Sequence, residues 1–316
     1  MPAEPVAEPT AARPFVDRPA RDDHAAKRLA EEAALAIGSP APRLVRTAMN
    51  AIFRGGDVAL RVSHTTAPAS AAYDLADALT DTGLRVTRPH ASRVVLTAGS
   101  LSVTAWEWLD GALAPTSDGE WYGVGAMAAT LHGLDASVVP DAYPLPSCRS
   151  FPWWDFETCL ADTRGFIDDS ALTGLEEAIA RNAASLERAS DVVGHVVAHG
   201  DIHPANVMAS AAGPVLIDWD LLCSAPPEWD HAPLLSMTAR WGTPKSVLVA
   251  FRAGYTSLRT DSIDPDMVAA LAELRAVAAT IMRVRAEGPD RRPDGEAARR
   301  LRHWRGDPGA PVWSVI

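Results

Sequence analysis

The stretch that decides the fold is H-G-D-I-H-P-A-N-V, from His199 to Val207, followed by V-L-I-D-W-D, from Val215 to Asp220. Asp201 lies five residues before Asn206, and Asp218 ends the second apolar run. The apolar runs on either side predict two short strands around a loop. A single Asp-x-x-x-x-Asn would occur by chance in many loops. Two aspartates and an asparagine at this spacing, next to two predicted strands, indicate a catalytic site.

These residue types suit phosphoryl transfer. The reaction needs a carboxylate that orients the attacking hydroxyl and accepts its proton, and oxygen ligands for the Mg²⁺ that bridges the phosphates. Protein kinases use H-R-D-x-x-x-x-N and the aspartate of D-F-G in this way. The spacing therefore predicts Asp201 as the catalytic base and Asn206 with Asp218 as the metal ligands.

The two motifs resemble the aminoglycoside phosphotransferase and choline kinase-like family, which has a kinase-like fold. Gly200 stands where protein kinases have arginine, which favours the antibiotic and choline branch. The resemblance covers roughly residues 43 to 235. Outside the catalytic loop it includes N-A-I-F-R-G-G-D-V-A-L-R-V at Asn50–Val62, T-A-W-E-W-L at Thr104–Leu109, L-H-G-L at Leu131–Leu134 and P-P-E-W-D-H-A at Pro226–Ala232.

Periodicity along the chain indicates an α+β protein with a small antiparallel-sheet N-lobe and a larger, mostly helical C-lobe. We expect a disordered tail at 1–22, the nucleotide-binding N-lobe at 23–105, a hinge at 106–111 and the C-lobe at 112–316. A helix is expected from Asp23 to Ile37 on the apolar residues Ala26, Leu29, Ala33 and Leu35. G-V-G-A-M-A at Gly123–Ala128 lies in a helical pattern, so it is not a dinucleotide fingerprint.

A kinase also needs a cation on the third strand of the N-lobe, usually a lysine paired with a helix glutamate. The only lysines, Lys27 and Lys245, are in the wrong places, which leaves Arg61 in V-A-L-R-V. Arginine keeps its charge and binds phosphate bidentately. The alternative is an arginine on an exposed strand face. The possible acid partners are Asp74, Asp77 and Asp81, and of these we expect Asp74.

The other nucleotide contacts rest mainly on the resemblance. Asn50 and Ser63 flank the hairpin that takes the place of a glycine-rich loop. The backbone of the hinge residues would read the edge of the base; these residues are Trp106, Glu107, Trp108 and Leu109.

Several further residues support two interpretations each. His203 could touch substrate or phosphate, or be a hydrogen-bonded part of the loop scaffold. Asp220 and Asp230 are expected to orient the loop or cap a helix. Trp153 and Trp154 could line an acceptor pocket or pack in the core.

Composition restricts the partners. The chain has 316 residues and a formal net charge of -11, which argues against a nucleic-acid surface. Its three cysteines lack metal-ligand spacing, and its N-terminus lacks the pattern of a signal peptide. No apolar stretch approaches the roughly 20 residues needed to cross a bilayer. We therefore expect a cytoplasmic protein that does not bind membranes, either monomer or homodimer.

The expected function is transfer of the γ-phosphoryl group of ATP or GTP to a hydroxyl of an antibiotic, which would confer resistance. The acceptor would be an aminoglycoside or another basic or nucleoside natural product, because acids of the C-lobe could pair with its ammonium groups. One alternative is a metabolic kinase for choline, an amino sugar or a nucleoside. An alternative of another class is a non-catalytic, pseudokinase-like nucleotide-binding module.

Overall fold

The computed structural model describes residues 13–20, 23–191, 194–260, 262–288 and 294–314. The chain divides into two compact units. The first comprises Met1–Asp110, Ala136–Ser150 and Trp219–Ser224, and the second comprises Gly111–Asp135, Phe151–Asp218 and Ala225–Ile316. The short segments 136–150 and 219–224, which we expected within the C-lobe, therefore cluster with the first unit.

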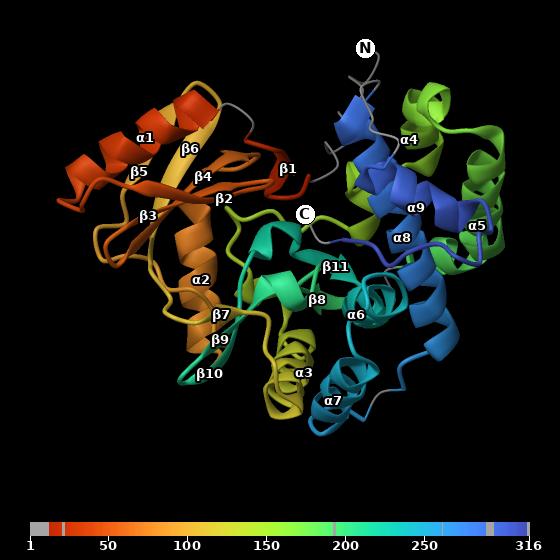
Figure 1. The fold of residues 1–316 in the computed structure, drawn as a ribbon. Coiled ribbons are helices and arrows are strands. Elements are labelled where there is room, and N and C mark those ends of the chain that lie inside the picture. Colours follow the sequence, from red (N-terminus) through yellow and green to blue (C-terminus); the bar gives the residue numbers. More distant parts are fainter. Residues whose placement is uncertain (1–12, 21–22, 192–193, 261, 289–293, 315–316) are drawn as a thin grey trace, which may run out of the picture. The chain divides into compact units, whose positions relative to one another are not determined.

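Among the described residues, the first unit consists mainly of one β-sheet and two α-helices (Figure 1). Its elements are β1 (Val16–Arg18), α1 (Asp23–Ala36), β2 (Arg43–Thr47), β3 (Ala51–Gly55), β4 (Val58–Thr65), α2 (Ala71–Asp81), β5 (Val95–Ala98) and β6 (Leu101–Glu107). The strand order is β2-β3-β4-β6-β5, β1 pairs with β4, and all these pairs are antiparallel. The expected antiparallel sheet is confirmed.

Helix α1 covers one face of this sheet. Its buried residues recur every three to four positions, as an amphipathic helix requires, and they pack on Phe53 and Leu60 of the strands. They are Ala26, Leu29, Ala30, Ala33 and Ala34. Leu35 was expected on this face but is 83% exposed. It follows Ala34 by one position and therefore points away from the sheet.

Residues 13–20, which we expected within a disordered tail, are folded. Residues 1–12 and 21–22 lie outside the described residues, but 13–20 carry β1, and Phe15 is buried. Phe15 stacks on Tyr143 with ring centroids 4.5 Å apart, and the Tyr143 hydroxyl donates to the Trp219 carbonyl at 2.9 Å. These contacts explain why segments distant in sequence join the first unit.

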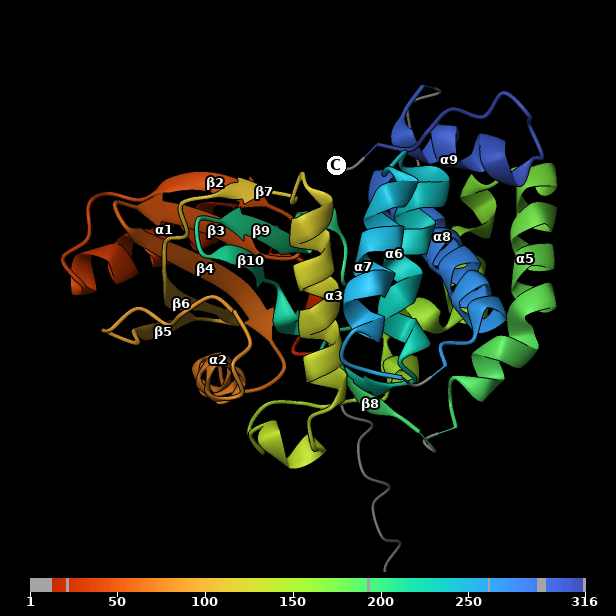
Figure 2. The same ribbon diagram turned by 90° about the horizontal axis from the view of Figure 1, so that it is seen from below.

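The second unit is mainly helical (Figures 1 and 2). Its helices are α3 (Asp118–His132), α4 (Phe156–Thr163), α5 (Asp169–Arg188), α6 (Glu228–Arg240), α7 (Lys245–Thr256), α8 (Pro265–Glu287) and α9 (Glu296–Trp304). Its strands are β7 (Ala112–Leu113), β8 (Val196–Ala198), β9 (Val207–Ser210) and β10 (Gly213–Leu216), and β11 (Cys223–Ala225) follows. The order β10-β9-β7 forms a small antiparallel sheet.

Helices α3 and α7 cross closely, side by side in Figure 2. A Cβ on Gly125 would lie 1.9 Å from the Phe251 carbonyl oxygen, and one on Gly254 would lie 1.9 Å from that of Tyr122. Only glycine fits at either position. Gly125 therefore serves helix packing, and G-V-G-A-M-A lies within a helix, as its sequence pattern predicted.

The α+β class expected from the sequence is confirmed by this division into an antiparallel-sheet region and a helical region. Within the described ranges, no helix combines the length and apolar character that a membrane span requires.

Candidate active site

The catalytic motif forms the loop between β8 and β9 in the second unit. Gly200 has φ +86°, a left-handed conformation that glycine adopts without steric cost. The turn brings the chain from β8 directly into Asp201. The backbone geometry thus explains why glycine, and not the arginine of protein kinases, precedes the aspartate.

Three side chains surround the Asp201 carboxylate. Arg275 of α8 forms an ion pair with Oδ1 and also donates to the Gly200 carbonyl at 3.2 Å. On the other side, Asn206 Nδ2 donates to Oδ2 at 3.2 Å and to the Asp201 carbonyl at 3.0 Å. His203 Nε2 lies 3.3 Å from Oδ2. The carboxylate is therefore fixed in orientation from both sides.

These neighbours also set the charge of Asp201. Burial alone would raise the pKa of its carboxyl, but His203 and Arg275 outweigh burial and hold the pKa below its ordinary range. Asp201 is therefore ionised at neutral pH, ready to accept a hydrogen bond from a hydroxyl.

Asp230, in the first turn of α6, binds the backbone of the catalytic loop. Its side chain is fully buried and accepts hydrogen bonds from the N–H groups of His199 and Gly200, both at 2.8 Å. His132 Nε2 lies 3.0 Å from the same carboxylate, and His132 Nδ1 lies 2.9 Å from the Tyr255 hydroxyl. Of the two roles expected for Asp230, these contacts match orientation of the loop.

A backbone hydrogen bond ties Asn206 to the residue that precedes Asp218. The Ile217 N–H donates to the Asn206 carbonyl at 3.0 Å, directly before Asp218. Asp218 has φ +66°, a left-handed conformation that is uncommon for residues other than glycine and is concentrated at functional sites.

A divalent cation fits this pair. The Asn206 amide nitrogen is engaged by Asp201, so the amide oxygen is the atom left to bind a cation, and the carboxylate of Asp218 is the second oxygen donor of the motif. Mg²⁺ prefers such hard oxygen ligands and usually takes one or two carboxylates together with substrate phosphates. Among the described residues, no cluster of three or more His, Cys, Asp or Glu could bind a metal without such additional ligands.

In the first unit, Arg61 lies on β4 and is 16% exposed, so it is not a surface arginine. Its ion-pair partner is Asp220, not Asp74 as expected. Asp74 lies on the exposed face of α2, because that helix buries its neighbours Tyr73 and Leu75. The acid comes instead from the segment 219–224, which the contact of Tyr143 with Trp219 draws into this unit.

Asp220 also binds the turn between β2 and β3. Asn50 Nδ2 donates to Asp220 Oδ2 at 2.8 Å, and Asn50 is 7% exposed. Ser63 is buried on β4, two residues beyond Arg61 and therefore on the same face of the strand. Asp220 thus connects Asn50, which we expected to contact the nucleotide, with the cation on β4.

The expected hinge has fewer available backbone donors than anticipated. The N–H of Glu107 donates to the Arg88 carbonyl at 2.9 Å, and that of Trp108 donates to the Asp57 carbonyl at 2.8 Å. The Trp106 side chain is buried, with Nε1 donating to Thr104 at 2.9 Å. Within the expected set, the N–H groups of Glu107 and Trp108 are therefore not available to read a base.

The two tryptophans differ. Trp154 is 2% exposed and packs on Trp229 with centroids 4.5 Å apart, so it belongs to the core. Trp153 is half-buried and stacks on Phe151, which leaves part of its ring accessible to a ligand. His203, besides contacting Asp201, accepts the Ala205 N–H at 3.1 Å, as a scaffold residue would.

Arg275 is the contact residue that sequence reasoning missed. It lies 74 residues beyond Asp201, outside any motif. One signal was present: α8 is apolar around Arg275, with Ala272, Leu274 and Ala276 all buried. A charged side chain in such a helix requires a partner.

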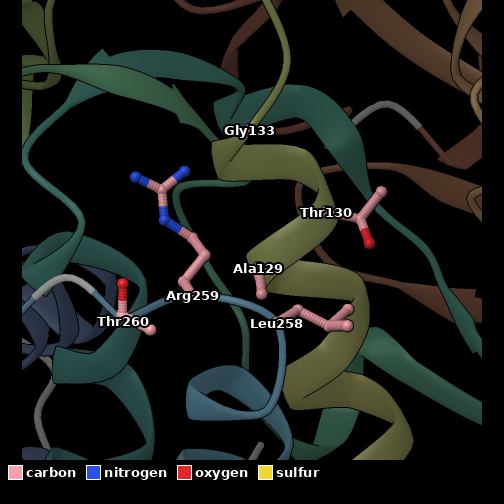
Figure 3. A pocket seen from close by; sticks show the side chains of 6 residues that line it. All are labelled: Ala129, Thr130, Gly133, Leu258, Arg259 and Thr260. Atoms are coloured by element: carbon pink, nitrogen blue, oxygen red, sulfur yellow. The ribbon is translucent and has the colours of Figure 1, made fainter.

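A shallow hollow of about 400 Å³ lies elsewhere in the second unit, at the end of α3 and the segment after α7 (Figure 3). It is lined by Ala129, Thr130, Gly133, Leu258, Arg259 and Thr260. Arg259 donates from Nη1 to the His132 carbonyl at 2.7 Å. The lining contains no carboxylate and no residue of the catalytic loop, so it lacks the groups for phosphoryl transfer.

Solved structures with this fold include several kinases. An amicoumacin kinase in complex with AMP-PNP, Ca²⁺ and Ami superposes with a TM-score of 0.70 at 14% identity, covering 93% of this chain and 97% of that one. An AMP-bound spectinomycin phosphotransferase gives 0.60 at 13% identity, covering 89% and 94%. The choline kinase LicA from Streptococcus pneumoniae gives 0.59 at 14% identity, covering 89% and 98%. These similarities establish the fold.

No curated protein matches the chain in sequence. A family model does: the model described as the phosphotransferase enzyme family (APH) matches residues 8–271. The match covers most of the chain and includes Arg61 and the whole catalytic motif through Asp230. This bears out both the resemblance and the expected enzyme class. The chain is therefore a phosphotransferase and belongs to the phosphotransferase enzyme family.

Proposed function

We propose that this phosphotransferase moves the γ-phosphoryl group of ATP or GTP to a hydroxyl of an antibiotic and thereby confers resistance. The observation that carries the proposal is the Asp201 carboxylate, fixed by Asn206 and Arg275 on a loop that Asp230 holds from beneath. Such fixation is what positional catalysis requires of a base.

In the proposed reaction, the acceptor hydroxyl donates a hydrogen bond to Asp201. Its oxygen attacks the γ-phosphorus in line, the bond from that phosphorus to the bridging oxygen of the β-phosphate breaks, and the hydroxyl proton passes to Asp201. The low pKa of Asp201 makes it a weak base, so it takes the proton late, after most of the bond to phosphorus has formed. No covalent enzyme intermediate is needed.

Asn206 and Asp218 would hold Mg²⁺ through the amide oxygen and the carboxylate. When bound, Mg²⁺ supplies neutralisation of the charge on the phosphates. The left-handed backbone at Asp218 supports this role, because such conformations persist where a side chain must be aimed at a site.

On the nucleotide side, Arg61 would bind the phosphates, with Asp220 and Asn50 holding it and the adjoining turn in place. A cation with a buried acidic partner is what an active kinase maintains in this position. This arrangement favours catalysis over the pseudokinase-like alternative, which the missing lysine and glutamate had suggested.

The acceptor class is inferred from two observations. Neighbours of this fold are named for amicoumacin and spectinomycin, which favours an antibiotic. In addition, the partly accessible ring of Trp153 offers a surface on which an acceptor could stack. A metabolic choline kinase is the second candidate, favoured by the fold shared with the choline kinase LicA.

Fewer acids of the helical region are available to bind ammonium groups than the sequence suggested. Several of these acids are already paired with arginine, namely Asp162, Asp168, Glu176 and Glu273. An ammonium group would therefore compete with a guanidinium for each of them. A basic acceptor remains our proposal, with its affinity coming more from stacking and shape than from these four acids.

The test is a coupled nucleotide-turnover assay with Mg²⁺, run with ATP and with GTP. The acceptor panel includes aminoglycosides, spectinomycin, amicoumacin, macrolides, nucleoside antibiotics, choline and amino sugars. We expect one antibiotic class to stimulate turnover and to be recovered as a phosphate ester by mass spectrometry. Stimulation by choline alone would favour the metabolic kinase, and nucleotide binding without any turnover would favour the pseudokinase-like module.

A further inference from the structure

We propose that Arg275 is a positioning residue of the phosphoryl-transfer reaction, which fixes Asp201 so that Oδ2 receives the acceptor hydroxyl. The inference rests on the proposed function and extends it to a residue outside the catalytic motif. The family match ends at residue 271, before Arg275, so the assignment comes from the contacts alone.

The guanidinium makes two contacts with the catalytic loop. One nitrogen, Nη2, forms the ion pair with Asp201 Oδ1, and the other, Nη1, donates to the Gly200 carbonyl at 3.2 Å. The planar guanidinium fork binds the side chain of Asp201 and the backbone of Gly200 at the same time. It therefore fixes the carboxylate relative to the loop that carries it. Arg275 thus determines the rotation of the Asp201 side chain.

The two carboxylate oxygens are held unequally. Oδ1 bears the ion pair with the planar guanidinium of Arg275, whereas Oδ2 is contacted by Asn206 at 3.2 Å and by His203 at 3.3 Å. Contacts of this length are at the long end of the hydrogen-bond range. An incoming hydroxyl therefore displaces or shares a contact on Oδ2 at a lower cost than it would on Oδ1.

The setting of Arg275 excludes an incidental surface contact. Its side chain and that of Asp201 are each 19% exposed, and the helix around it is apolar. Burying the charged guanidinium of Arg275 in this apolar setting costs free energy unless an oppositely charged partner is held beside it. The long helix α8 supplies a rigid base for the fork, so the geometry is maintained when acceptor enters and product leaves.

The test compares Arg275→Ala and Arg275→Lys with the control Arg283→Ala. Arg283 lies two turns further along α8 on the same face, is 23% exposed and pairs only loosely with Glu287 at 3.9 Å. We expect Arg275→Ala to lower kcat by about 10- to 100-fold, with KM for nucleotide and acceptor within about threefold of the wild-type values. Arg275→Lys should be intermediate, because an ammonium cannot reproduce the planar fork. The control should retain wild-type kcat.

Chemical rescue separates positioning from a merely structural role. Guanidinium ion, added at millimolar concentrations below those that unfold the protein, should raise kcat of Arg275→Ala at least severalfold and leave Arg283→Ala unchanged. Where Arg275→Ala does not fold, Arg275→Lys carries the test through its kcat and KM values.

Three outcomes would overturn the inference: wild-type kcat in a folded Arg275→Ala or in Arg275→Lys, a loss confined to the KM for nucleotide, or no rescue by guanidinium in a folded variant. The second outcome would make Arg275 a phosphate ligand instead. Absence of nucleotide turnover in the wild-type protein would overturn the proposed function, and this inference with it, whereas normal wild-type turnover with an unaffected variant would overturn the inference alone.

Discussion

Two arginine–aspartate pairs, one in each unit, connect the catalytic motif to the rest of the chain, and their partners have opposite roles. In the first unit, Arg61 is the group proposed to meet substrate, and Asp220 supports it. In the second, Asp201 is the proposed reacting group, and Arg275 supports it. In the proposed reaction, the cation of one such pair binds the nucleotide and the anion of the other binds the acceptor.

The two pairs also differ in how much other structure holds them. Asp220 binds both Arg61 and Asn50. Asp201, by contrast, has Asn206 and His203 beside it, and its loop is held independently by Asp230. Loss of Asp220 should therefore disturb Arg61 and Asn50 together, whereas loss of Arg275 leaves three other side chains in contact with Asp201 or its loop.

The largest effect is expected at Asp201. Replacement by Asn keeps the shape but removes the proton acceptor, so kcat should fall by about 10³-fold or more. The coupled assay measures this, with thermal unfolding to verify the fold. Asp162→Asn, which removes an exposed carboxylate paired with Arg285, is the matched control and should retain wild-type kcat. Turnover above a tenth of the wild-type value in Asp201→Asn would contradict the assignment.

The next largest effect is expected at Arg61. Arg61→Met should raise KM for nucleotide roughly 10- to 100-fold, because charge-assisted hydrogen bonds to phosphate are lost. Asp220→Asn should show a smaller loss of the same kind. In the double variant the two losses should be clearly less than additive, since Asp220 acts through Arg61. Additive losses would mean that Asp220 supports the nucleotide by another route.

Much of the site could be predicted from sequence because it is local. Asp201, Asn206 and Asp218 lie in one motif between two strands, so their spacing in the chain determines their placement. Arg61 was predicted because it lies on the expected strand and the lysines lie elsewhere. The structure places all four residues on the elements expected for them.

The partners of these residues could not be predicted, because they come from distant segments. Asp220 joins Arg61 across 159 residues of chain, and Arg275 joins Asp201 across 74. The choice of Asp74 assumed that the partner comes from the following helix, whereas the face of α2 that carries it is exposed. Residues 13–20 were assigned to a tail by composition, although two buried residues, Phe15 and Val16, are enough to place β1 against β4.

The Asp230→Asn variant tests how much the hydrogen bonds of Asp230 to the catalytic loop stabilise the protein. Its carboxylate accepts three donors in full burial, and Asn would offer one acceptor oxygen and an amide that donates. Asp230→Asn should lower the free energy of unfolding by about 2 to 4 kcal/mol, measured by urea denaturation at pH 7. Asp162→Asn is again the control and should change it by about 0.5 kcal/mol or less. Equal stability of the two variants would show that the loop does not depend on Asp230.

The smallest effect concerns His231, next to Asp230, and it appears only in acid. Both ring nitrogens are buried without a hydrogen-bond partner among the described residues, and burial lowers the pKa of His231 to about 3. The unfolded chain, with an ordinary pKa of about 6.5, binds more protons than the folded one below that pH. The stability due to neutral His231 is therefore complete above about pH 6.5 and is lost as the pH falls toward 3.

Between pH 7 and pH 5 this residue should cost the wild-type protein about 2 kcal/mol of unfolding free energy. His231→Met, which fills a similar volume between Phe251 and Tyr255 without titrating, should lose correspondingly less over the same interval. Urea titrations of both proteins at the two pH values measure the difference. An equal loss of unfolding free energy in both proteins would mean that the acid sensitivity arises from groups other than His231.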